Sequence, residues 1–264
     1  MDQRLHANRP GLAGKPMEIV APVAPMLGGP TETAAQTTQA LFGEKILAYE
    51  SQNGYLWCQL QRDNYVGYIH AGFASEKLST PSHRVSVRST LLYPSAGIKS
   101  QPVISIPMNA ALEITEADEE FSRLSNGKFV FTKHLKPIGE HELDFVGVAE
   151  RFLDTPYYWG GKSHLGLDCS GLVQISLEAC GVPALRDADL QEEQLGQSLI
   201  INDLASLRRG DLVFWDGHVG IMCDDKNLLH ANGFHMIAVK ELLAEAIGRI
   251  AATGSQITSI KRLQ

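Results

Sequence analysis

The chain has 264 residues, of which 44% are hydrophobic and 20% charged, and its formal net charge is −7. This length and balance are typical of a globular protein with two or three domains. Proteins that bind nucleic acid use positive charge to displace the counterions of its phosphates, and this chain has a net negative charge, so we expect no nucleic-acid partner. No stretch approaches the roughly 20 apolar residues that span a bilayer, so we expect no membrane partner either.

Residues 1–14 are polar, contain Pro and Gly, and lack the apolar run of a secretory signal. They predict a disordered leader, and the missing signal favours a cytoplasmic location. A mature form whose signal had been removed would look similar, although Met1 argues against that alternative.

Residues 15–80 carry short apolar runs broken by Gly, Pro and Asn, a pattern typical of β-strands. Asn53-Gly54 and Asp63-Asn64 each separate two such runs and predict tight turns. The phrase DNYVGYI, residues 63–69, resembles the D-x-Y-x-G-W/Y-V signature of bacterial SH3-like domains. This resemblance implies a small SH3-like β-barrel.

Residues 81–138 repeat this plan less faithfully. An alignment of the two segments gives three matches: Gly43–Ala48 with Asn109–Ile114, Trp57 with Phe121, and Tyr68-Ile69 with Phe129-Val130. We therefore expect a second, diverged SH3-like barrel. Because no tyrosine in it matches Tyr65, we expect its role to be structural.

Residues 139–264 change to a mixed pattern. Apolar residues recur at helical spacing before Pro156, namely Leu143, Val146, Ala149, Phe152 and Leu153. Asp168 opens a second helix, CSGLVQISLEACG, and the runs GDLVFW, HVGIMC and NLLHA predict three antiparallel strands. The expected fold class of this domain is α+β.

The four cysteines, Cys58, Cys169, Cys180 and Cys223, form no CxxC pair and no regular framework. We expect neither a zinc site nor disulfides, and no metal or other cofactor. Cys169 stands at a helix start, where unpaired N–H groups and the helix dipole favour a thiolate. We therefore expect Cys169 to be a nucleophile and Cys180 and Cys223 to be structural.

Two histidines are candidate partners of this thiolate. His218 follows the tight Asp216-Gly217 turn, and His230 ends the next strand, twelve residues further on. Neighbouring antiparallel strands can bring two such rings side by side. We expect His218 to act as a general base and His230 to orient it, as the third member of a catalytic triad does.

The motifs PYYWGG, DCSG, GDLVFW-x-x-HVGI and LLHA, in this order, resemble those of the NlpC-type family of papain-related cell-wall peptidases. The resemblance covers about residues 140–264. It implies a papain-like domain and cysteine peptidase activity, with Cys169, His218 and His230 in the three catalytic positions. It also implies that the Tyr157 hydroxyl lies near the nucleophile, where it could assist the oxyanion beside the Cys169 backbone N–H.

Barrels ahead of such a peptidase resemble one branch of the family, the γ-D-glutamyl-L-diamino acid endopeptidases. The resemblance implies a cleft with room for two residues before the cut, and a free L-alanine amine held by acidic and phenolic groups. The matching candidates are Asp168, Ser170, Tyr65 and Glu44. The implied partner is a murein-derived L-Ala-γ-D-Glu-diaminopimelate peptide, cleaved at the γ-D-Glu bond during peptidoglycan recycling.

Each binding candidate has a plainer alternative. Asp168 and Ser170 also suit helix capping. Glu44 also suits a solvated strand edge, and Tyr65 also suits packing inside the barrel. Arg186, which follows the second helix, could meet a substrate carboxylate or lie in a solvated loop.

Two other functions are compatible with the sequence. The same residues could serve an amidase or acyltransferase that acts on lipid or protein substrates. Alternatively, the chain could bind wall peptides without catalysis. Intact Cys169, His218 and His230 argue against this second alternative.

Overall fold

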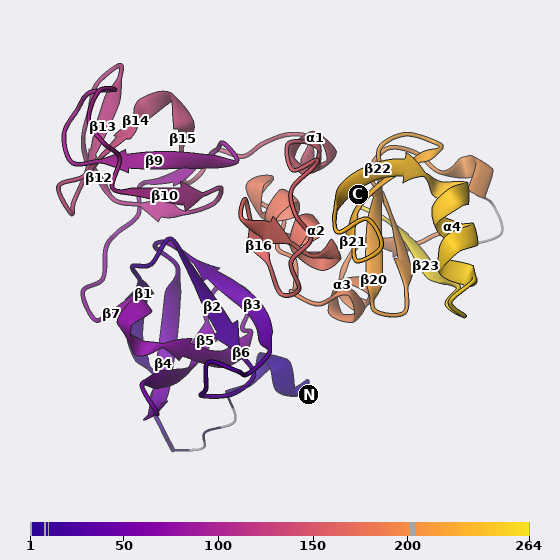
Figure 1. Ribbon diagram of the computed structural model, residues 1–264, viewed down its shortest axis with the longest axis horizontal. Coiled ribbons are helices and arrows are strands. Elements are labelled where there is room, and N and C mark those ends of the chain that lie inside the picture. The colour runs from indigo at the N-terminus through magenta and orange to yellow at the C-terminus, as the bar shows by residue number, and fades with distance from the viewer. Residues whose placement is uncertain (1, 8, 10, 201–203, 264) are drawn as a thin grey trace. The chain divides into compact units, whose positions relative to one another are not determined.

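The computed structural model describes residues 2–7, 9, 11–200 and 204–263. The chain divides into two compact units, unit 1 (Met1–His141) and unit 2 (Glu142–Gln264). Unit 1 consists almost entirely of strands, whereas unit 2 combines helices with a sheet (Figure 1). In the described part of the chain, no helix is long and apolar enough to cross a membrane.

The first β segment of unit 1 forms one antiparallel sheet in the order β3-β2-β6-β5-β4-β1-β7. Its strands are β1 (Lys15–Ile19), β2 (Val23–Leu27), β3 (Gln36–Leu41), β4 (Lys45–Gln52), β5 (Tyr55–Leu60), β6 (Val66–His70) and β7 (Ala74–Ser75), with a 3-10 turn, η2 (Ala71–Phe73), before β7. Asn53 and Gly54 both have positive φ, 52° and 81°, as the predicted turn between β4 and β5 requires. The alternating buried residues of these strands meet in one apolar cluster that includes Ile46, Cys58 and Leu60.

The leader is not disordered where the structure describes it. Gln3–Leu5 forms a 3-10 turn, η1. The Gln59 amide donates to the Leu5 carbonyl at 3.0 Å, and the Trp57 indole donates to the Ala7 carbonyl at 3.0 Å. Since Leu5 also packs on the apolar cluster of the first β segment, tertiary contacts override the polar composition that predicted disorder.

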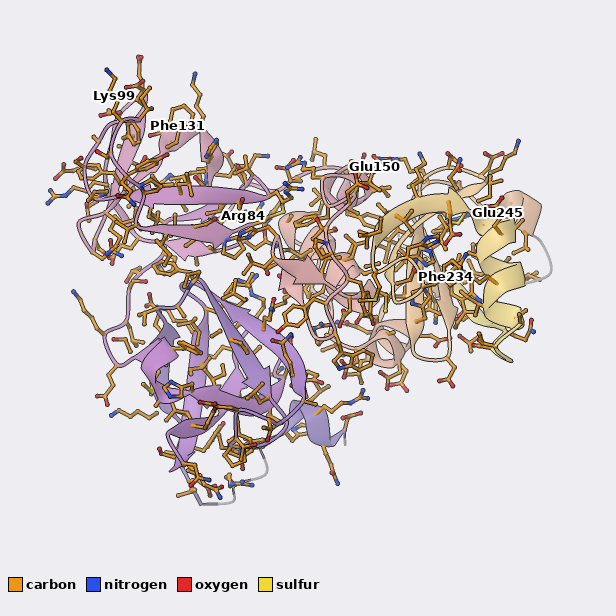
Figure 2. All side chains as sticks on the ribbon, in the orientation of Figure 1. Arg84, Lys99, Phe131, Glu150, Phe234 and Glu245 are labelled. Atoms are coloured by element: carbon orange, nitrogen blue, oxygen red, sulfur yellow. The ribbon has the colours of Figure 1, made fainter. Side chains whose placement is uncertain are left out.

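The second β segment, residues 83–137, has the same strand order as the first. Its main sheet runs β10-β9-β14-β13-β12, and a smaller one runs β11-β8-β15. The strands are β8 (His83–Val85), β9 (Ser89–Tyr93), β10 (Ile104–Pro107), β11 (Ala111–Leu112), β12 (Ile114–Ala117), β13 (Phe121–Leu124), β14 (Phe129–Phe131) and β15 (Leu135–Pro137), with η3 (Thr132–His134) before β15. Phe131, labelled in Figure 2, packs edge-on against Phe121 with ring centroids 6.0 Å apart.

Gly43 and Asn109 occupy the same position in the two β segments. Both have positive φ, 81° and 64°. The Gly43 N–H donates to the Ile19 carbonyl at 2.8 Å, and the Asn109 N–H donates to the Val85 carbonyl at 2.9 Å. The matching backbone geometry supports the internal repeat that the sequence alignment predicted.

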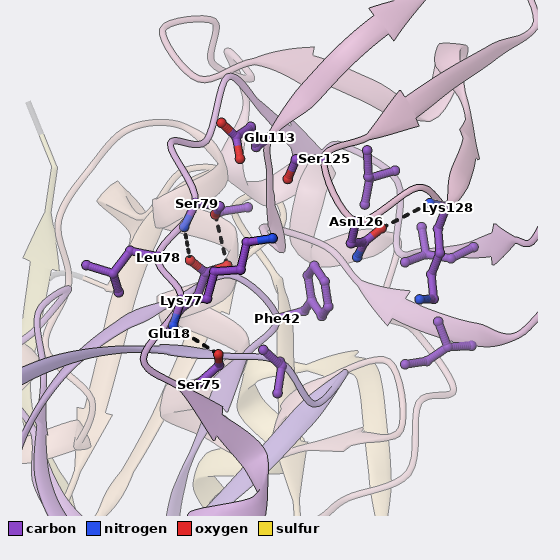
Figure 3. Close-up of a pocket in the computed structure, with 15 residues that line it drawn as sticks. Glu18, Phe42, Ser75, Lys77, Leu78, Ser79, Glu113, Ser125, Asn126 and Lys128 are labelled. Carbon is purple, nitrogen blue, oxygen red and sulfur yellow. Dashed lines mark hydrogen bonds between the residues drawn. The ribbon is translucent and has the colours of Figure 1, made fainter.

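A cavity of about 330 Å³ lies between the two β segments of unit 1 (Figure 3). Phe42 and Lys77 from the first segment and Glu113, Ser125 and Lys128 from the second line it. The two segments have separate apolar clusters. They meet around this cavity and at Phe42, which packs against the apolar cluster of the second segment.

Unit 2 contains an antiparallel sheet in the order β18-β23-β19-β20-β21-β22. Its strands are β16 (Lys162–Ser163) and β17 (Gly166–Leu167), which pair with each other, and β18 (Gln197–Ser198), β19 (Asp211–Trp215), β20 (His218–Met222), β21 (Asn227–Asn232), β22 (Ile237–Leu242) and β23 (Ile257–Arg262). Its helices are α1 (Phe145–Glu150), α2 (Cys169–Ala179), α3 (Ala188–Gln194) and α4 (Leu243–Ala251), with a 3-10 turn η4 (Leu204–Ser206). The predicted second helix and three strands are therefore present.

Two helices of unit 2 contact the sheet through different residues. Helix α2, all but one of whose residues are buried, contacts β20 and β21. Helix α4 buries Leu243 and Ala246 in a cluster with Val213, Trp215 and Met222. Leu143 lies outside α1 and is fully exposed, so its assignment to that helix was wrong. The helix begins after Asp144, whose carboxylate accepts from the Val146 N–H at 3.0 Å.

Candidate active site

Cys169 is the first residue of α2. Asp168 caps this helix, because its Oδ1 accepts a hydrogen bond from the Gly171 N–H at 2.7 Å. The predicted helix start and the capping role of Asp168 are both present. The cap places the candidate nucleophile where backbone N–H groups have no partner within the helix.

The glycines of PYYWGG and CSG allow two stretches of backbone to come into contact. A Cβ atom on Gly171 would lie 2.1 Å from the Gly161 carbonyl oxygen. That same oxygen accepts from the Asp168 N–H at 3.1 Å. The turn before α2 therefore lies against its first residues, and a side chain at position 171 would separate them.

Arg186 is part of the site and not of a solvated loop, so that interpretation of the sequence was wrong. Its side chain is only 1% exposed. It donates to both carboxylate oxygens of Asp168, at 3.0 and 2.7 Å, and to Ser170 Oγ at 2.8 Å. Such bidentate pairing fixes the orientation of a carboxylate. Arg186 thus neutralises Asp168 and holds both residues that flank Cys169.

The sulfur of Cys169 lies against the start of β20. It is buried, with the residue 7% exposed. The backbone N–H of Val219 is within hydrogen-bonding reach of the sulfur. Because Val219 follows His218 in the chain, the two candidate catalytic residues come from elements that are in contact at this point.

Burial controls the protonation of both groups. It raises the pKa of the Cys169 thiol to about 12, and the Asp168 carboxylate adds to the shift. Burial, together with His230, lowers the pKa of His218 to about 3. Both shifts favour an uncharged thiol and an uncharged imidazole in the resting pair. Burial therefore acts against the predicted resting thiolate, whereas hydrogen bonds from the Val219 and Ser170 N–H groups act in its favour.

The two histidines meet as the sequence predicted. His218 Nε2 lies 2.8 Å from His230 Nδ1, and the ring centroids are 5.0 Å apart. His230 is 1% exposed. Because His218 Nε2 is engaged by His230, its Nδ1 is the ring nitrogen that can accept another proton.

Two further residues extend this pair and were missed in the sequence. Glu241 Oε1 lies 2.6 Å from His230 Nε2. Arg249 donates to both Glu241 oxygens, at 2.7 and 2.6 Å. Neither residue belongs to a motif with recognisable spacing. Only the pairing of β21 with β22, in which His230 and Val239 are partners, brings Glu241 close.

Tyr157 lies close enough to Cys169 and Asp168 for their charges to act on its hydroxyl. Burial, and then Cys169 and Asp168, raise the pKa of Tyr157 to about 12. The phenol stays protonated at neutral pH and can donate a hydrogen bond. Its backbone is fixed by a hydrogen bond of 2.8 Å to the Met236 carbonyl.

Glu44 and Tyr65 lie in unit 1. The Glu44 side chain is 1% exposed and its Oε1 pairs with Arg62 Nε at 2.9 Å, so the alternative of a solvated strand edge was wrong. Tyr65 belongs to the apolar cluster of the first β segment. Their predicted contribution to substrate binding stays a prediction.

The other cysteines have no place in this cluster. In the described part of the chain, no disulfide links any of the four cysteines. Cys180 follows the last residue of α2, and Cys223 follows β20. Among the described residues, no group of His, Cys, Asp and Glu is arranged to hold a metal ion.

A cavity of about 290 Å³ lies beside the two rings in unit 2. His218, His230, Trp215, Phe234 and Arg249 are among the residues that line it. Phe234, labelled in Figure 2, lies next to α4, and the Arg249 guanidinium covers its ring at 4.7 Å.

These features together suit nucleophilic catalysis. They provide a thiol at a helix start, an uncharged imidazole oriented by a second imidazole, and two candidate donors for an oxyanion, the Cys169 N–H and the Tyr157 hydroxyl. The arrangement can attack a carbonyl carbon and then protonate a leaving amine.

Comparisons with known proteins agree with this chemistry. The sequence pattern of the NlpC/P60 family matches residues 154–249, and the pattern described as "Bacterial dipeptidyl-peptidase Sh3 domain" matches residues 26–72. Over 238 residues the chain is 25% identical to dipeptidyl-peptidase 6 of Lysinibacillus sphaericus, covering 81% of this chain and 86% of that protein. Over 231 residues it is 28% identical to the gamma-D-glutamyl-L-lysine dipeptidyl-peptidase of Bacillus subtilis, covering 78% and 75%.

The fold also has a solved counterpart. The crystal structure of an NlpC/P60 family protein from Bacillus cereus matches with a TM-score of 0.79 at 18% sequence identity. The match covers 94% of this chain and 99% of that one. At this identity the likeness concerns the fold alone. It supports an NlpC/P60 fold together with an SH3-like domain.

Proposed function

The chain is a cysteine peptidase of the NlpC/P60 family that carries an SH3 domain of the bacterial dipeptidyl-peptidase type, and we propose that it cleaves peptidoglycan-derived peptides between γ-D-glutamate and a diamino acid. The names of the two curated relatives support this bond, since both are dipeptidyl-peptidases and one name specifies γ-D-glutamyl-L-lysine. One observation carries the reaction type. The buried thiol of Cys169 begins α2 and lies beside Val219, next to the bonded His218–His230 pair.

In the proposed reaction, Cys169 is the nucleophile and His218 is the base. The S–H proton passes to His218 Nδ1 as the sulfur bonds to the substrate carbonyl carbon. The Cys169 N–H and the Tyr157 hydroxyl donate to the oxyanion. His218 then gives its proton to the leaving amine, and water hydrolyses the thioester with His218 again as base.

The proposed substrate has a free L-alanine amine, held by Asp168, Ser170, Tyr65 and Glu44. A desolvated ammonium requires a carboxylate nearby. Arg186 already neutralises Asp168. The Glu44 carboxylate is likewise paired with Arg62, whose side chain is 31% exposed.

The leaving diamino acid is proposed to occupy the cavity beside His218. The general acid must touch the departing nitrogen, so the residue that carries this nitrogen lies next to the ring. The cavity has aromatic walls and room for a side chain of this size. Diaminopimelate is the proposed diamino acid, and a cytoplasmic role in peptidoglycan recycling is the proposed context.

The second β segment is proposed to be a diverged SH3-like domain with a structural role. Its strand order and the backbone hydrogen bond at Asn109 support this proposal. No aromatic hydroxyl takes the place of Tyr65 in it, as the alignment of the two segments indicates.

Digestion of synthetic peptides, scored by product mass, tests the function. We expect L-Ala-γ-D-Glu-diaminopimelate to be cut at the γ-D-Glu bond and its N-acetylated form to resist. Cys169→Ala and His218→Ala should abolish turnover while circular dichroism stays unchanged. Full activity in either variant would contradict the catalytic assignment. Equal rates on free and acetylated peptides would contradict the amine site alone.

A further inference from the structure

The histidine pair in unit 2 ends on a partly buried ion pair. His230 Nε2 lies 2.6 Å from Glu241 Oε1, and Arg249 binds both oxygens of that carboxylate. Burial acts to raise the pKa of Glu241, but hydrogen bonds from Arg249 and His230 outweigh it and lower the pKa to about 2. Glu241 is therefore a carboxylate at any pH at which the protein works.

A carboxylate can only accept hydrogen bonds, and this fixes the protons along the pair. His230 Nε2 must carry a hydrogen to bond Glu241, so its Nδ1 has a lone pair. His218 Nε2 then donates to that lone pair across 2.8 Å. The remaining nitrogen of His218, Nδ1, is left as an acceptor.

Asn232 competes for the same nitrogen of His230. Its Nδ2 lies 2.9 Å from His230 Nε2, and its Oδ1 is held by the Phe234 and His235 N–H groups at 3.1 and 2.8 Å. The amide thus presents a donor, which favours the opposite tautomer. The Glu241 contact is shorter and charged, and such bonds are about twice as strong as neutral ones. The Glu241 carboxylate therefore determines the tautomer of His230, with the proton on Nε2.

We propose that Glu241, anchored by Arg249, is a positioning residue for catalysis: it fixes the proton of His230 on Nε2 and so leaves His218 Nδ1 able to accept the Cys169 proton. The inference rests on the proposed roles of Cys169 and His218. It adds a fourth and a fifth residue to the three that the sequence motifs indicated.

Glu241 also faces the charge that develops in the reaction. When the thiol proton reaches His218 Nδ1, the ring becomes an imidazolium while the sulfur bonds to carbon. Three charged or titratable neighbours surround Glu241: His230 on β21, Arg249 on α4 and His235 at 3.6 Å. Of the four groups only Glu241 is negative, and its charge acts to raise the pKa of His218, whereas the charge of Arg249 acts to lower it.

Glu241→Gln is the discriminating variant. Arg249 donates to both carboxylate oxygens, at 2.7 and 2.6 Å, so it can hold the new amide oxygen at either position. With the amide nitrogen at the Oε1 position, His230 Nε2 must accept and must carry its proton on Nδ1. With the amide oxygen at that position, the contact is uncharged and no longer outweighs the Asn232 donor. In both cases the His230 proton shifts towards Nδ1, so His218 accepts at Nε2 and holds its own proton on Nδ1, where the lone pair is needed.

Asp211→Asn is the matched control. Asp211 is a buried carboxylate of the same sheet, bound by two nitrogens of Arg262 at 2.6 Å each, and no histidine of the described residues is hydrogen-bonded to it. Both variants weaken a partly buried ion pair. If Glu241 only supported the fold, the two variants would affect kcat alike.

The experiment combines kinetics with histidine spectroscopy on the full chain. We expect Glu241→Gln to lower kcat by about 10- to 100-fold with KM little changed, the range observed when a residue that orients a metal-bound imidazole through a hydrogen bond is replaced. Asp211→Asn should lower the melting temperature but leave kcat within about twofold, since surrounding structure alone is perturbed. Glu241→Asp keeps the charge and should recover part of kcat.

Two readouts need no peptide substrate. In 15N-histidine spectra, the His230 proton should move from Nε2 to Nδ1 in Glu241→Gln. Alkylation of Cys169 by iodoacetamide, followed by peptide mass mapping, should slow in the same variant. An unchanged His230 tautomer, or a kcat within about twofold of the unmodified chain, would overturn the proposal. If the unmodified chain cleaves no murein peptide, the proposed function fails, while the tautomer and alkylation rate still decide the role of Glu241.

Discussion

Replacing Arg186 with methionine tests how the residues around Cys169 are held. The substitution keeps most of the side-chain volume but removes the guanidinium, which donates twice to Asp168, once to Ser170 and once to the Gly161 carbonyl. Asp168 would remain buried and charged, supported by the N–H groups of Gly160 and Gly171 and by the Ser170 hydroxyl at 3.3 Å. Removing one partner of a buried ion pair costs about 3–5 kcal/mol.

The exposed pair made by Arg209 provides a matched control. Arg209 also contacts two carboxylates, those of Asp144 and Glu150, but its side chain is 39% exposed. Pairs of this kind contribute about 0–1 kcal/mol. Arg186→Met should therefore lower the free energy of unfolding several times more than Arg209→Met.

Urea unfolding measures this difference. A Trp57→Phe background removes the tryptophan of unit 1, so that Trp159 and Trp215 report unit 2 alone. If the free energy of unfolding falls by about 2 kcal/mol per molar urea, Arg186→Met should lower the urea midpoint by about 2 M. A loss below about 1 kcal/mol, or one equal to that of Arg209→Met, would refute the reasoning. A double-mutant cycle with Asp168→Asn should give a coupling of about 0.5–3 kcal/mol.

Three further predictions each follow from a single structural feature. Gly171→Ala should lower both stability and kcat, because its Cβ would lie 2.1 Å from the Gly161 carbonyl oxygen. In the control, Gly248→Ala on α4, the new Cβ meets nothing within 4 Å, so this variant should be neutral or stabilising in thermal melts. Burial lowers the pKa of His218 to about 3, against 6.5 in the unfolded chain, so the free energy of unfolding should fall as the pH falls from about 6.5 towards 3. His218→Gln should make the free energy of unfolding depend less on pH in this range. The same pH dependence in both proteins would contradict the assignment. Cys180→Ala should leave peptide turnover unchanged, and a loss of activity would show that its thiol takes part.

The features that the sequence predicted correctly are those that depend on short stretches of residues, such as helix starts and tight turns. Asp168 before an apolar helix marks an N-cap, and the helix does begin at Cys169. The turns at Asn53-Gly54 and Asp216-Gly217 join strands where their composition predicted them. His218 and His230 could be paired in advance because both lie on strands joined by a short turn.

What the sequence did not predict depends on long-range packing and on burial. Arg186 sits in a polar stretch, and only the fold of the chain after α2 places it against Asp168. Glu241 and Arg249 have no motif and meet His230 through strand pairing and the position of α4. The resting state of the thiol also required the structure, since the helix start and burial shift its pKa in opposite directions.

The contact at Gly43 joins the two β segments of unit 1 through their backbones. The Ala111 N–H donates to the Phe42 carbonyl at 2.9 Å, and a Cβ on Gly43 would lie 2.1 Å from the Ala111 carbonyl oxygen. This close approach requires glycine at position 43, and any larger residue there should force the two backbones apart.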